Sequence, residues 1–176
     1  SIEIVGEKVD RAYYESIKTL CIKKDLIQEM AGELEIIFTP LHGSGNVPVR
    51  TILSELGYAK VHVVPEQELP DGNFPTAPYP NPENPDVFEL ALKMNENINA
   101  DLIFGTDPDA DRLGVVVLEE DGTSQVLSGN QTGMLITNYM LKALTEEGKL
   151  PENGVIIKTI VTTESVRKIA EKYGVE

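Results

Sequence analysis

The sequence is poor in basic residues relative to acidic ones. Only 15 lysines and arginines stand against 29 aspartates and glutamates, which gives a formal net charge of −14. Nucleic acids and membrane surfaces are bound through basic patches, so this balance argues against both as partners. It does not argue against a phosphorylated substrate, because a bound divalent cation and a few local basic side chains can override the field of the whole chain.

The chain also contains a single cysteine, Cys21, which excludes an internal disulfide. Cys21 lies on the apolar face of a predicted helix, so we expect it to be part of a core rather than catalytic. No stretch approaches the roughly 18 apolar residues of a membrane-spanning helix, and no signal peptide is visible at the start. We therefore expect a cytoplasmic protein.

Hydrophobic periodicity predicts alternating helices and strands. The expected helices are residues 9–30, 47–56, 87–95, 131–147 and 164–172, and the expected strands are residues 34–39, 60–64, 100–104, 113–119, 124–127 and 155–161. The strand, turn, helix and strand over residues 34–64 imply a parallel pair with a right-handed crossover. Asp121 and Gly122 are the expected turn of a hairpin. The predicted fold is α/β: a mixed, mostly parallel sheet flanked by helices in three α/β/α layers.

A chain of 176 residues has room for one large domain or up to two small ones. We expect a boundary at Gly129 and Asn130, with one domain over residues 1–128. Residues 129–176 would then form the opening α-β-α of a second, partial α/β unit. Both ends of the chain fall inside or beside predicted elements, so we expect a piece of a longer protein.

Residues 69–86, the proline-rich loop, carry six of the chain's 11 prolines. Proline lacks a backbone donor, and the loop also contains Gly72 and several asparagines, so it cannot be a helix or a central strand. Phe74 and Tyr79 offer apolar anchors. We therefore expect an ordered loop that packs on the domain rather than a flexible linker.

Residues 107–112, the acidic loop, follow a predicted buried strand and contain Asp107, Asp109, Asp111 and Arg112. Three carboxylates this close raise one another's pKa, and a bound cation relieves the repulsion. Oxygen ligands without a neighbouring histidine or cysteine favour a hard ion, Mg²⁺ before Mn²⁺ or Ca²⁺. Loops at the ends of buried strands are common places for sites. The sequence therefore indicates a divalent-cation site here.

Two other interpretations of the acidic loop exist. The run is also compatible with a solvated turn in an acidic protein. An EF-hand fits poorly, because that motif needs glycine at its sixth position and glutamate at its twelfth, where this chain has Arg112 and Leu118. The flanking segments are also predicted strands rather than helices.

Residues 40–46, the glycine turn, contain Gly43 and Gly45 at the start of a predicted helix. A dinucleotide fingerprint needs a third glycine where this chain has Pro48, and the phosphate-binding lysine of a P-loop is absent. The pattern of a nucleophile elbow is absent as well. We therefore expect His42 and Ser44 to shape the turn or support a neighbouring site rather than form a catalytic pair.

Three motifs occur in a fixed order: TPLHGSGN at residues 39–46, PDGNFP at 70–75 with NPE at 81–83, and GTDPDADR at 105–112. Together they resemble the α-D-phosphohexomutase family, the phosphoglucomutases and phosphomannomutases. The resemblance spans nearly the whole chain. It corresponds to the second domain and the start of the third domain of a four-domain enzyme.

The resemblance implies an isomerase of carbohydrate metabolism that interconverts hexose 1-phosphates and 6-phosphates. A phosphoserine in the first domain donates its phosphate to the sugar and regains one from the bisphosphate intermediate. By this resemblance Asp107, Asp109 and Asp111 bind Mg²⁺ beside the phosphoserine. Arg112 would be a catalytic residue that contacts the phosphoserine or the substrate phosphate, and Lys158 would contact the substrate. An ion pair of Arg112 with its own neighbours and an ordinary exposed Lys158 are the alternatives.

The family's phosphorylation motif, its sugar-recognition loop and its fourth domain are not in this sequence, so we expect the chain alone to be inactive. Of the two sugars, glucose is favoured over mannose. Two other classes stay open: a Mg²⁺-dependent phosphatase with an aspartate nucleophile, and a non-enzymatic Ca²⁺- or Mg²⁺-binding module. Such phosphatases carry the aspartate pair after the first strand of the domain, whereas here it follows the third. The oligomeric state is left undetermined.

Overall fold

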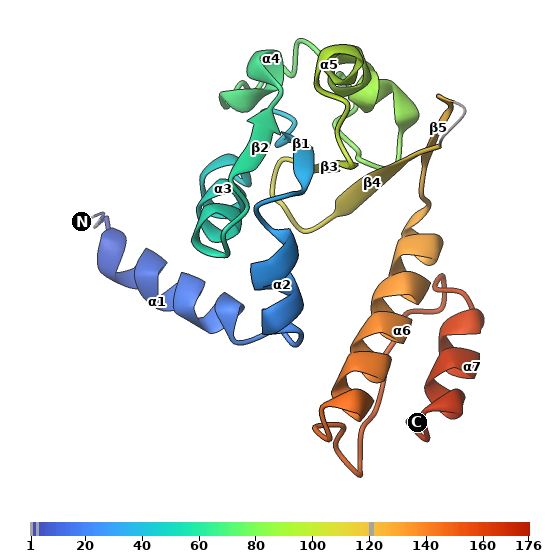
Figure 1. The fold of residues 1–176 in the computed structure, drawn as a ribbon. Coiled ribbons are helices and arrows are strands. Elements are labelled where there is room, and N and C mark those ends of the chain that lie inside the picture. The colour runs from blue at the N-terminus through green and yellow to red at the C-terminus, as the bar shows by residue number, and fades with distance from the viewer. Residues whose placement is uncertain (1, 3, 120–121) are drawn as a thin grey trace.

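In the part of the chain that the structure describes, five strands form one mixed sheet in the order β2-β1-β3-β4-β5. The computed structural model describes residues 2, 4–119 and 122–176 (Figure 1). Strand β1 (Glu35–Thr39) pairs in parallel with β2 (Lys60–Val63) and with β3 (Leu102–Thr106). Strand β4 (Leu113–Leu118) is antiparallel to both β3 and β5 (Ser124–Val126). The predicted mixed sheet is confirmed, although Asp121 of the expected hairpin turn lies outside the described residues.

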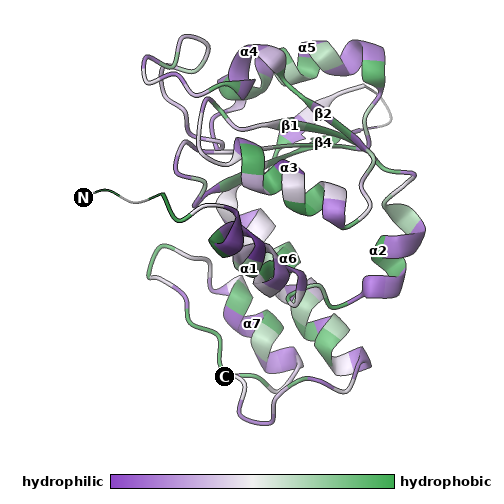
Figure 2. Ribbon diagram, turned by 90° about the vertical axis from the view of Figure 1, so that its left-hand side faces the viewer, coloured by the Kyte–Doolittle hydropathy of each residue, from purple (hydrophilic) through white to green (hydrophobic). Residues whose placement is uncertain are grey.

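Helices cover both faces of the sheet, as the predicted three layers require. Helices α4 (Pro65–Glu68) and α5 (Glu89–Ile98) lie on one face, together with the short 3₁₀ turn η1 (Pro85–Phe88). Helix α3 (Asn46–Glu55) lies on the other face. Figure 2 shows the strands between α4 and α5 on one side and α3 on the other.

The main core lies where α5 and η1 pack on the sheet. Phe88, Ile37 and Ile103 are fully buried there. The cluster is completed by Leu41, Val64, Ala77, Val87, Ala91, Ala100 and Val116. Because β1 and β3 lie at the centre of the sheet, the two segments that leave their carboxyl ends, the glycine turn and the acidic loop, are both mounted on the best-packed part of the molecule.

The single helix predicted for residues 9–30 is two helices, α1 (Glu7–Lys18) and α2 (Lys24–Met30). The hydroxyl of Thr19 donates to the backbone carbonyl of Ser16 (2.6 Å), a local bond that competes with continuation of the helix. Cys21 lies in the break and is only half-buried, beside a small cavity of about 190 Å³. The expectation of a buried core cysteine is therefore wrong.

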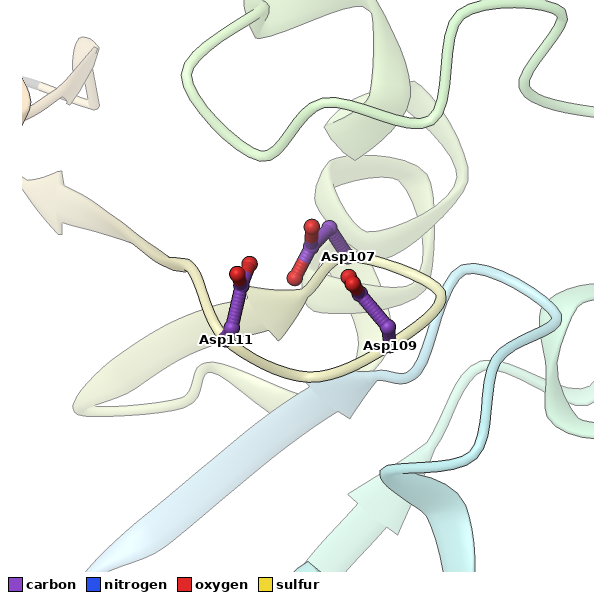
Figure 3. A group of neighbouring side chains, drawn as sticks. All are labelled: Asp107, Asp109 and Asp111. Carbon is purple, nitrogen blue, oxygen red and sulfur yellow. The ribbon is translucent and has the colours of Figure 1, made fainter.

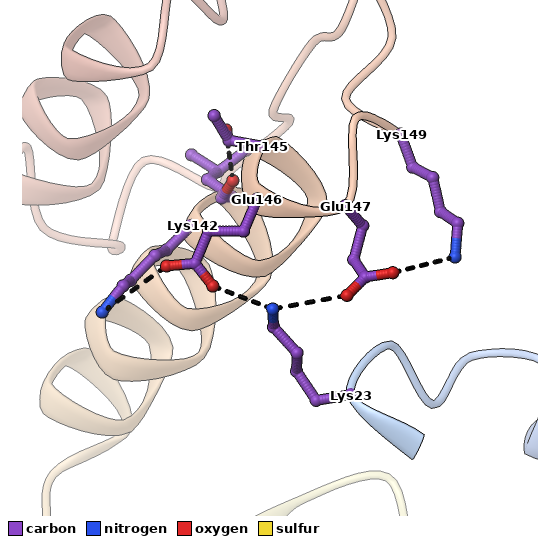
Figure 4. Close-up of polar contacts among 7 residues, drawn as sticks. Lys23, Lys142, Thr145, Glu146, Glu147 and Lys149 are labelled. Atoms are coloured by element: carbon purple, nitrogen blue, oxygen red, sulfur yellow. Dashed lines mark hydrogen bonds and ion pairs between the residues drawn. The ribbon is translucent and has the colours of Figure 1, made fainter. Parts of the chain in front are cut away.

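Helix α6 (Gly129–Glu146) runs away from the sheet and packs alongside α7 (Ser165–Lys172). A capping box starts α6: the Ser128 hydroxyl accepts from the Gln131 backbone N–H, and the Gln131 side chain accepts from the Ser128 backbone N–H. At its other end, Lys23 pairs with Glu146 (2.9 Å) and Glu147 (3.4 Å), as Figure 4 shows. Among the described residues, no helix is both long and apolar enough to cross a membrane.

The strand predicted for residues 155–161 is not part of any sheet in the described chain. A strand needs a partner, and Ile157 and Ile160 are 93% and 98% exposed. One end of the segment does pair: Ile156 N–H donates to the Glu176 carbonyl (2.7 Å), and Glu176 N–H donates to the Gly154 carbonyl (3.3 Å). This is the hydrogen-bond pattern of a parallel strand pair. The helices of residues 129–176 have a small core of their own around Leu141, Ala170 and Val175.

Glu35 on β1 makes the chain's stability depend on pH. His62 on β2 hydrogen-bonds to its carboxylate (2.5 Å), and Lys60 lies 3.5 Å away. The hydrogen bond with His62, supported by the charges of Lys60 and His62, lowers the pKa of Glu35. A lowered folded-state pKa adds stability above the unfolded value of about 4.3, and that stability is lost as pH falls through the folded-state pKa.

We therefore expect Glu35→Gln to lower the melting temperature at pH 7 and the gap to wild type to close as the pH falls below about 4. Thermal unfolding between pH 3 and 8 measures this. Glu33→Gln is the matched control, because its carboxylate has no ion pair within the described residues. A gap that stays constant over this range would contradict the prediction.

Candidate metal centre

The acidic loop connects β3 to β4 at the carboxyl end of β3. The parallel register of β1 and β3 places Thr39 opposite Gly105, so the glycine turn leaves the sheet beside the acidic loop. In open α/β sheets, ligands bind at the carboxyl ends of parallel strands. The fold therefore positions both loops where a site is expected.

The three aspartates of the acidic loop converge. Carboxylate oxygens of Asp107, Asp109 and Asp111, one from each, lie within 4.8 Å of one another, and Figure 3 shows the side chains directed towards a common space. Asp107 is fully buried, whereas Asp109 and Asp111 are exposed. The loop turns sharply because Ala110 adopts a left-handed conformation (φ 60°) and donates its N–H to the Asp107 carbonyl (3.0 Å). One buried and two exposed carboxylates would suit a cation that is approached from solvent.

Arg112 holds the buried aspartate in place. Its Nε lies 2.8 Å from Asp107 Oδ2, its backbone N–H donates to Asp107 Oδ1 (2.9 Å), and its Nε is 3.7 Å from Asp111. The ion pair with its own neighbours, one of the two interpretations from the sequence, is therefore present. The side chain is 53% exposed, so the guanidinium also faces solvent at the rim of the site.

The pKa values of Asp107 and Asp109 are shifted in opposite directions. Burial raises the pKa of Asp107, but the backbone N–H and the guanidinium of Arg112 outweigh it, so the pKa lies below its usual value. The pKa of Asp109 is raised, first by its hydrogen bond with Asp107 and then by the charges of Asp111 and Asp107. Without a cation, the ionised loop therefore carries uncompensated repulsion centred on Asp109. The donor set, three carboxylates without histidine or cysteine, fits Mg²⁺.

The glycine turn packs closely against the acidic loop at Pro108. The Ser44 backbone N–H and hydroxyl both donate to the Pro108 carbonyl, at 2.8 and 3.0 Å. A Cβ on Gly43 would lie 2.4 Å from the Pro108 Cα, so glycine is needed for this approach. His42 and Ser44 do not pair with each other: His42 bonds to the proline-rich loop and Ser44 to Pro108. The structural role expected for both residues agrees with these contacts.

The proline-rich loop forms the opposite wall of a cleft of about 550 Å³ above the acidic loop. The lining residues are Phe74, Tyr79, Pro80, Asn81, Asp107, Pro108, Asp109 and Arg112. The loop is ordered as expected, but its anchors differ, because Pro82 and Ala77 are buried while Tyr79 is 81% exposed. Sequence reasoning missed this wall. Its signal was the pair of aromatic residues in the loop: Phe74 packs on His42 as an anchor, whereas Tyr79 is exposed and lines the cleft.

Lys158 lies outside this cleft. Its Nζ pairs with Glu164 (2.6 Å) and donates to the Thr162 carbonyl (3.2 Å). The turn that holds it is tied to the start of α6, because the Thr163 N–H donates to Asn130 (2.9 Å). Of the site residues predicted from the sequence, the three aspartates and Arg112 are thus brought together, and Lys158 is not.

The fold and the loop define a three-layer α/β domain with a candidate divalent-cation site at the carboxyl end of its central strands. A family model described as phosphoglucomutase/phosphomannomutase, alpha/beta/alpha domain II, matches residues 11–121. The chain therefore belongs to the phosphoglucomutase/phosphomannomutase family of α-D-phosphohexomutases, as its motifs predicted.

Curated relatives match over most of the chain. A phosphoglucomutase of Staphylococcus saprophyticus is 35% identical over 175 residues, which cover 99% of this chain and 30% of the relative. A probable phosphomannomutase of Haemophilus influenzae is 36% identical over 149 residues, or 85% of this chain and 30% of the relative. This chain thus spans about 30% of the length of these relatives.

Solved structures confirm the fold. The crystal structure of a putative phosphomannomutase from Thermus thermophilus matches with a TM-score of 0.67 at 22% identity, over 95% of this chain and 35% of that one. At this level of identity the likeness concerns the fold alone.

Proposed function

We propose that this chain supplies the cation-binding part of a cytoplasmic phosphohexomutase that interconverts hexose 1-phosphate and hexose 6-phosphate through a phosphoserine and a bisphosphate intermediate. The observation that carries the proposal is the convergence of three carboxylates on one loop, with an arginine beside them, in a chain of this family. Residues 1–128 would be the second domain of the enzyme, and residues 129–176 the start of its third.

Asp107, Asp109 and Asp111 would hold Mg²⁺. When bound, Mg²⁺ supplies positive charge that offsets the charge of a phosphoryl group during transfer. Arg112 would position a phosphate at the rim, because a guanidinium presents a fixed fork of donors that matches phosphate oxygens. Its Nε stays on Asp107, which fixes the plane of the group. Lys158 would contact the substrate only after leaving Glu164, so we assign it a secondary role.

Relatives named for glucose and for mannose both match this chain, and the proposal covers both sugars with phosphoglucomutase first. The chain has no serine in the setting of the family's phosphoserine motif. We therefore propose that it does not turn over hexose phosphates by itself.

A Mg²⁺ titration followed by thermal unfolding tests the cation site. An ion that binds only the folded chain raises the free energy of unfolding, by about 2.7 kcal/mol at a concentration 100 times its dissociation constant. We expect this stabilisation in the wild type and its loss in Asp109→Ala. Asp25→Ala is the matched control, because it removes one negative charge on α2 without touching the acidic loop.

Equal stabilisation of wild type and Asp109→Ala, or none of either, would contradict the proposed site. Two further outcomes would favour the other classes. Stronger stabilisation by Ca²⁺ than by Mg²⁺ would favour a non-enzymatic binding module. Hydrolysis of a simple phosphate monoester by the chain alone, lost in Asp107→Asn, would favour a phosphatase.

A further inference from the structure

We propose that His42 is a positioning residue that joins the two walls of the cleft and thereby sets the geometry of the acidic loop. The inference rests on the proposed cation site for its functional consequence. The contacts that carry it lie outside the acidic loop, and neither the aspartates nor Arg112 touch the imidazole through any hydrogen bond among the described residues.

The imidazole of His42 links two points of the proline-rich loop. Its Nδ1 lies 3.0 Å from the Leu69 carbonyl oxygen, and its Nε2 lies 2.9 Å from the Thr76 hydroxyl. Its ring meets that of Phe74 edge to face, with the centroids 6.4 Å apart. The residue is 6% exposed. Since Phe74 lines the cleft, His42 supports that wall from behind.

These partners fix the tautomer of the neutral ring. A carbonyl oxygen only accepts, so Nδ1 must carry the proton and donate to Leu69. In the neutral ring Nε2 is then the acceptor, and the Thr76 hydroxyl donates to it. Both ring nitrogens are hydrogen-bonded, which makes His42 a structural link with a defined orientation.

The backbone of His42 carries this link to the acidic loop. Leu41 and His42 both have left-handed conformations, with φ of 47° and 60°, which side-chain-bearing residues avoid unless the surroundings hold them there. The bonds of the His42 ring, and the bond from its N–H to the Gln67 carbonyl (2.9 Å), do so. Gly43 and Ser44 come next in the chain: Gly43 packs closely against Pro108, and Ser44 hydrogen-bonds to its carbonyl. If the ring is removed, the turn can relax and release Pro108.

Two measurements test this. In the metal-free chain, amide hydrogen exchange at Ser44, Ala110 and Arg112 reports on the acidic loop, because each of these N–H groups has an acceptor at Pro108 or Asp107. We expect His42→Ala to speed exchange at all three. We also expect it to weaken Mg²⁺ binding roughly tenfold, the range found when residues that support metal ligands are lost.

Matched variants separate positioning from general destabilisation. Ile36→Ala removes buried apolar volume at the other end of β1, so it should lower the melting temperature without a selective effect on these amides. His42→Asn tolerates the left-handed conformation and keeps a donor for Leu69, so it should recover most of the Mg²⁺ affinity. Thr76→Val removes only the partner of Nε2 and should have the smaller effect.

The proposal is overturned if exchange at the three amides rises no more in His42→Ala than in Ile36→Ala of equal melting temperature. It is also overturned if the wild type binds Mg²⁺ and His42→Ala and Ile36→Ala both bind it with the affinity of the wild type. Absence of Mg²⁺ binding by wild type would instead contradict the proposed cation site, and the exchange measurement would still decide the role of His42.

Discussion

Substitution of Gly114 by alanine is expected to destabilise the chain by about 3 kcal/mol, the upper end for overpacking a tight interior. Gly114 lies on β4 opposite Gly105, and a Cβ there would be 2.0 Å from the carbonyl oxygen of Pro82. Pro82 is fully buried and the clash is with backbone, so no side chain can turn away to relieve it. The proline-rich loop would have to lift off the sheet. Urea unfolding measures the loss.

Gly133→Ala is the control for the Gly114 substitution. Gly133 lies inside α6 with open space at the position of its missing Cβ, so alanine should stabilise the helix by up to about 1 kcal/mol. The two glycine substitutions should thus act in opposite directions. A Gly114→Ala variant as stable as wild type would show that the proline-rich loop is not held against β4 in solution.

Replacing Asp107 by asparagine is expected to cost the metal-free chain about 2 kcal/mol, since a buried acceptor of a charged partner is lost. The full cost of breaking a buried pair, about 3–5 kcal/mol, does not apply because Arg112 is half-exposed.

Asp109→Asn is expected to do the opposite and raise the melting temperature of the metal-free chain at pH 7. It removes the carboxylate that the other two aspartates repel.

The signs follow from the two pKa shifts. The pKa of Asp107 is lowered in the folded chain, so its ionised form stabilises above the unfolded value of about 3.9, and that contribution is lost as pH falls through the folded-state pKa. The pKa of Asp109 is raised, so its ionised form destabilises at neutral pH. Both variants should lose the response to Mg²⁺. Two shifts of the same sign in the metal-free chain would contradict this account.

The placement of these aspartates was predictable from local sequence. Leu102 to Phe104 is a short apolar run that must be buried, and the carboxylates that follow at every second position need compensation wherever they lie. The family was also predictable from the sequence, because each of its three motifs is continuous and the motifs follow one another in order along the chain. Helix boundaries shifted by a few residues, and the break at Thr19 was missed because a single side-chain-to-backbone bond decides it.

Contacts between distant segments were not predictable in the same way. The imidazole of His42 hydrogen-bonds to Leu69 and Thr76, which lie 27 and 34 residues further along the chain. No pattern in the sequence selects these two partners. Tyr79 lines the cleft rather than anchoring its loop, because Pro82 and Ala77 already fill the space against the sheet. Lys158 pairs with Glu164, a neighbour that becomes available only through the turn before α7.

The sequence by itself determined the α/β layers, the acidic loop and the family, since each depends on residues close together in the chain, where hydrophobic period and ligand chemistry act locally. The tertiary structure alone decided which loop faces the aspartates and that residues 155–161 remain largely unpaired. These outcomes depend on packing and on the presence of a partner strand, which are properties of segments that meet only after the chain has folded.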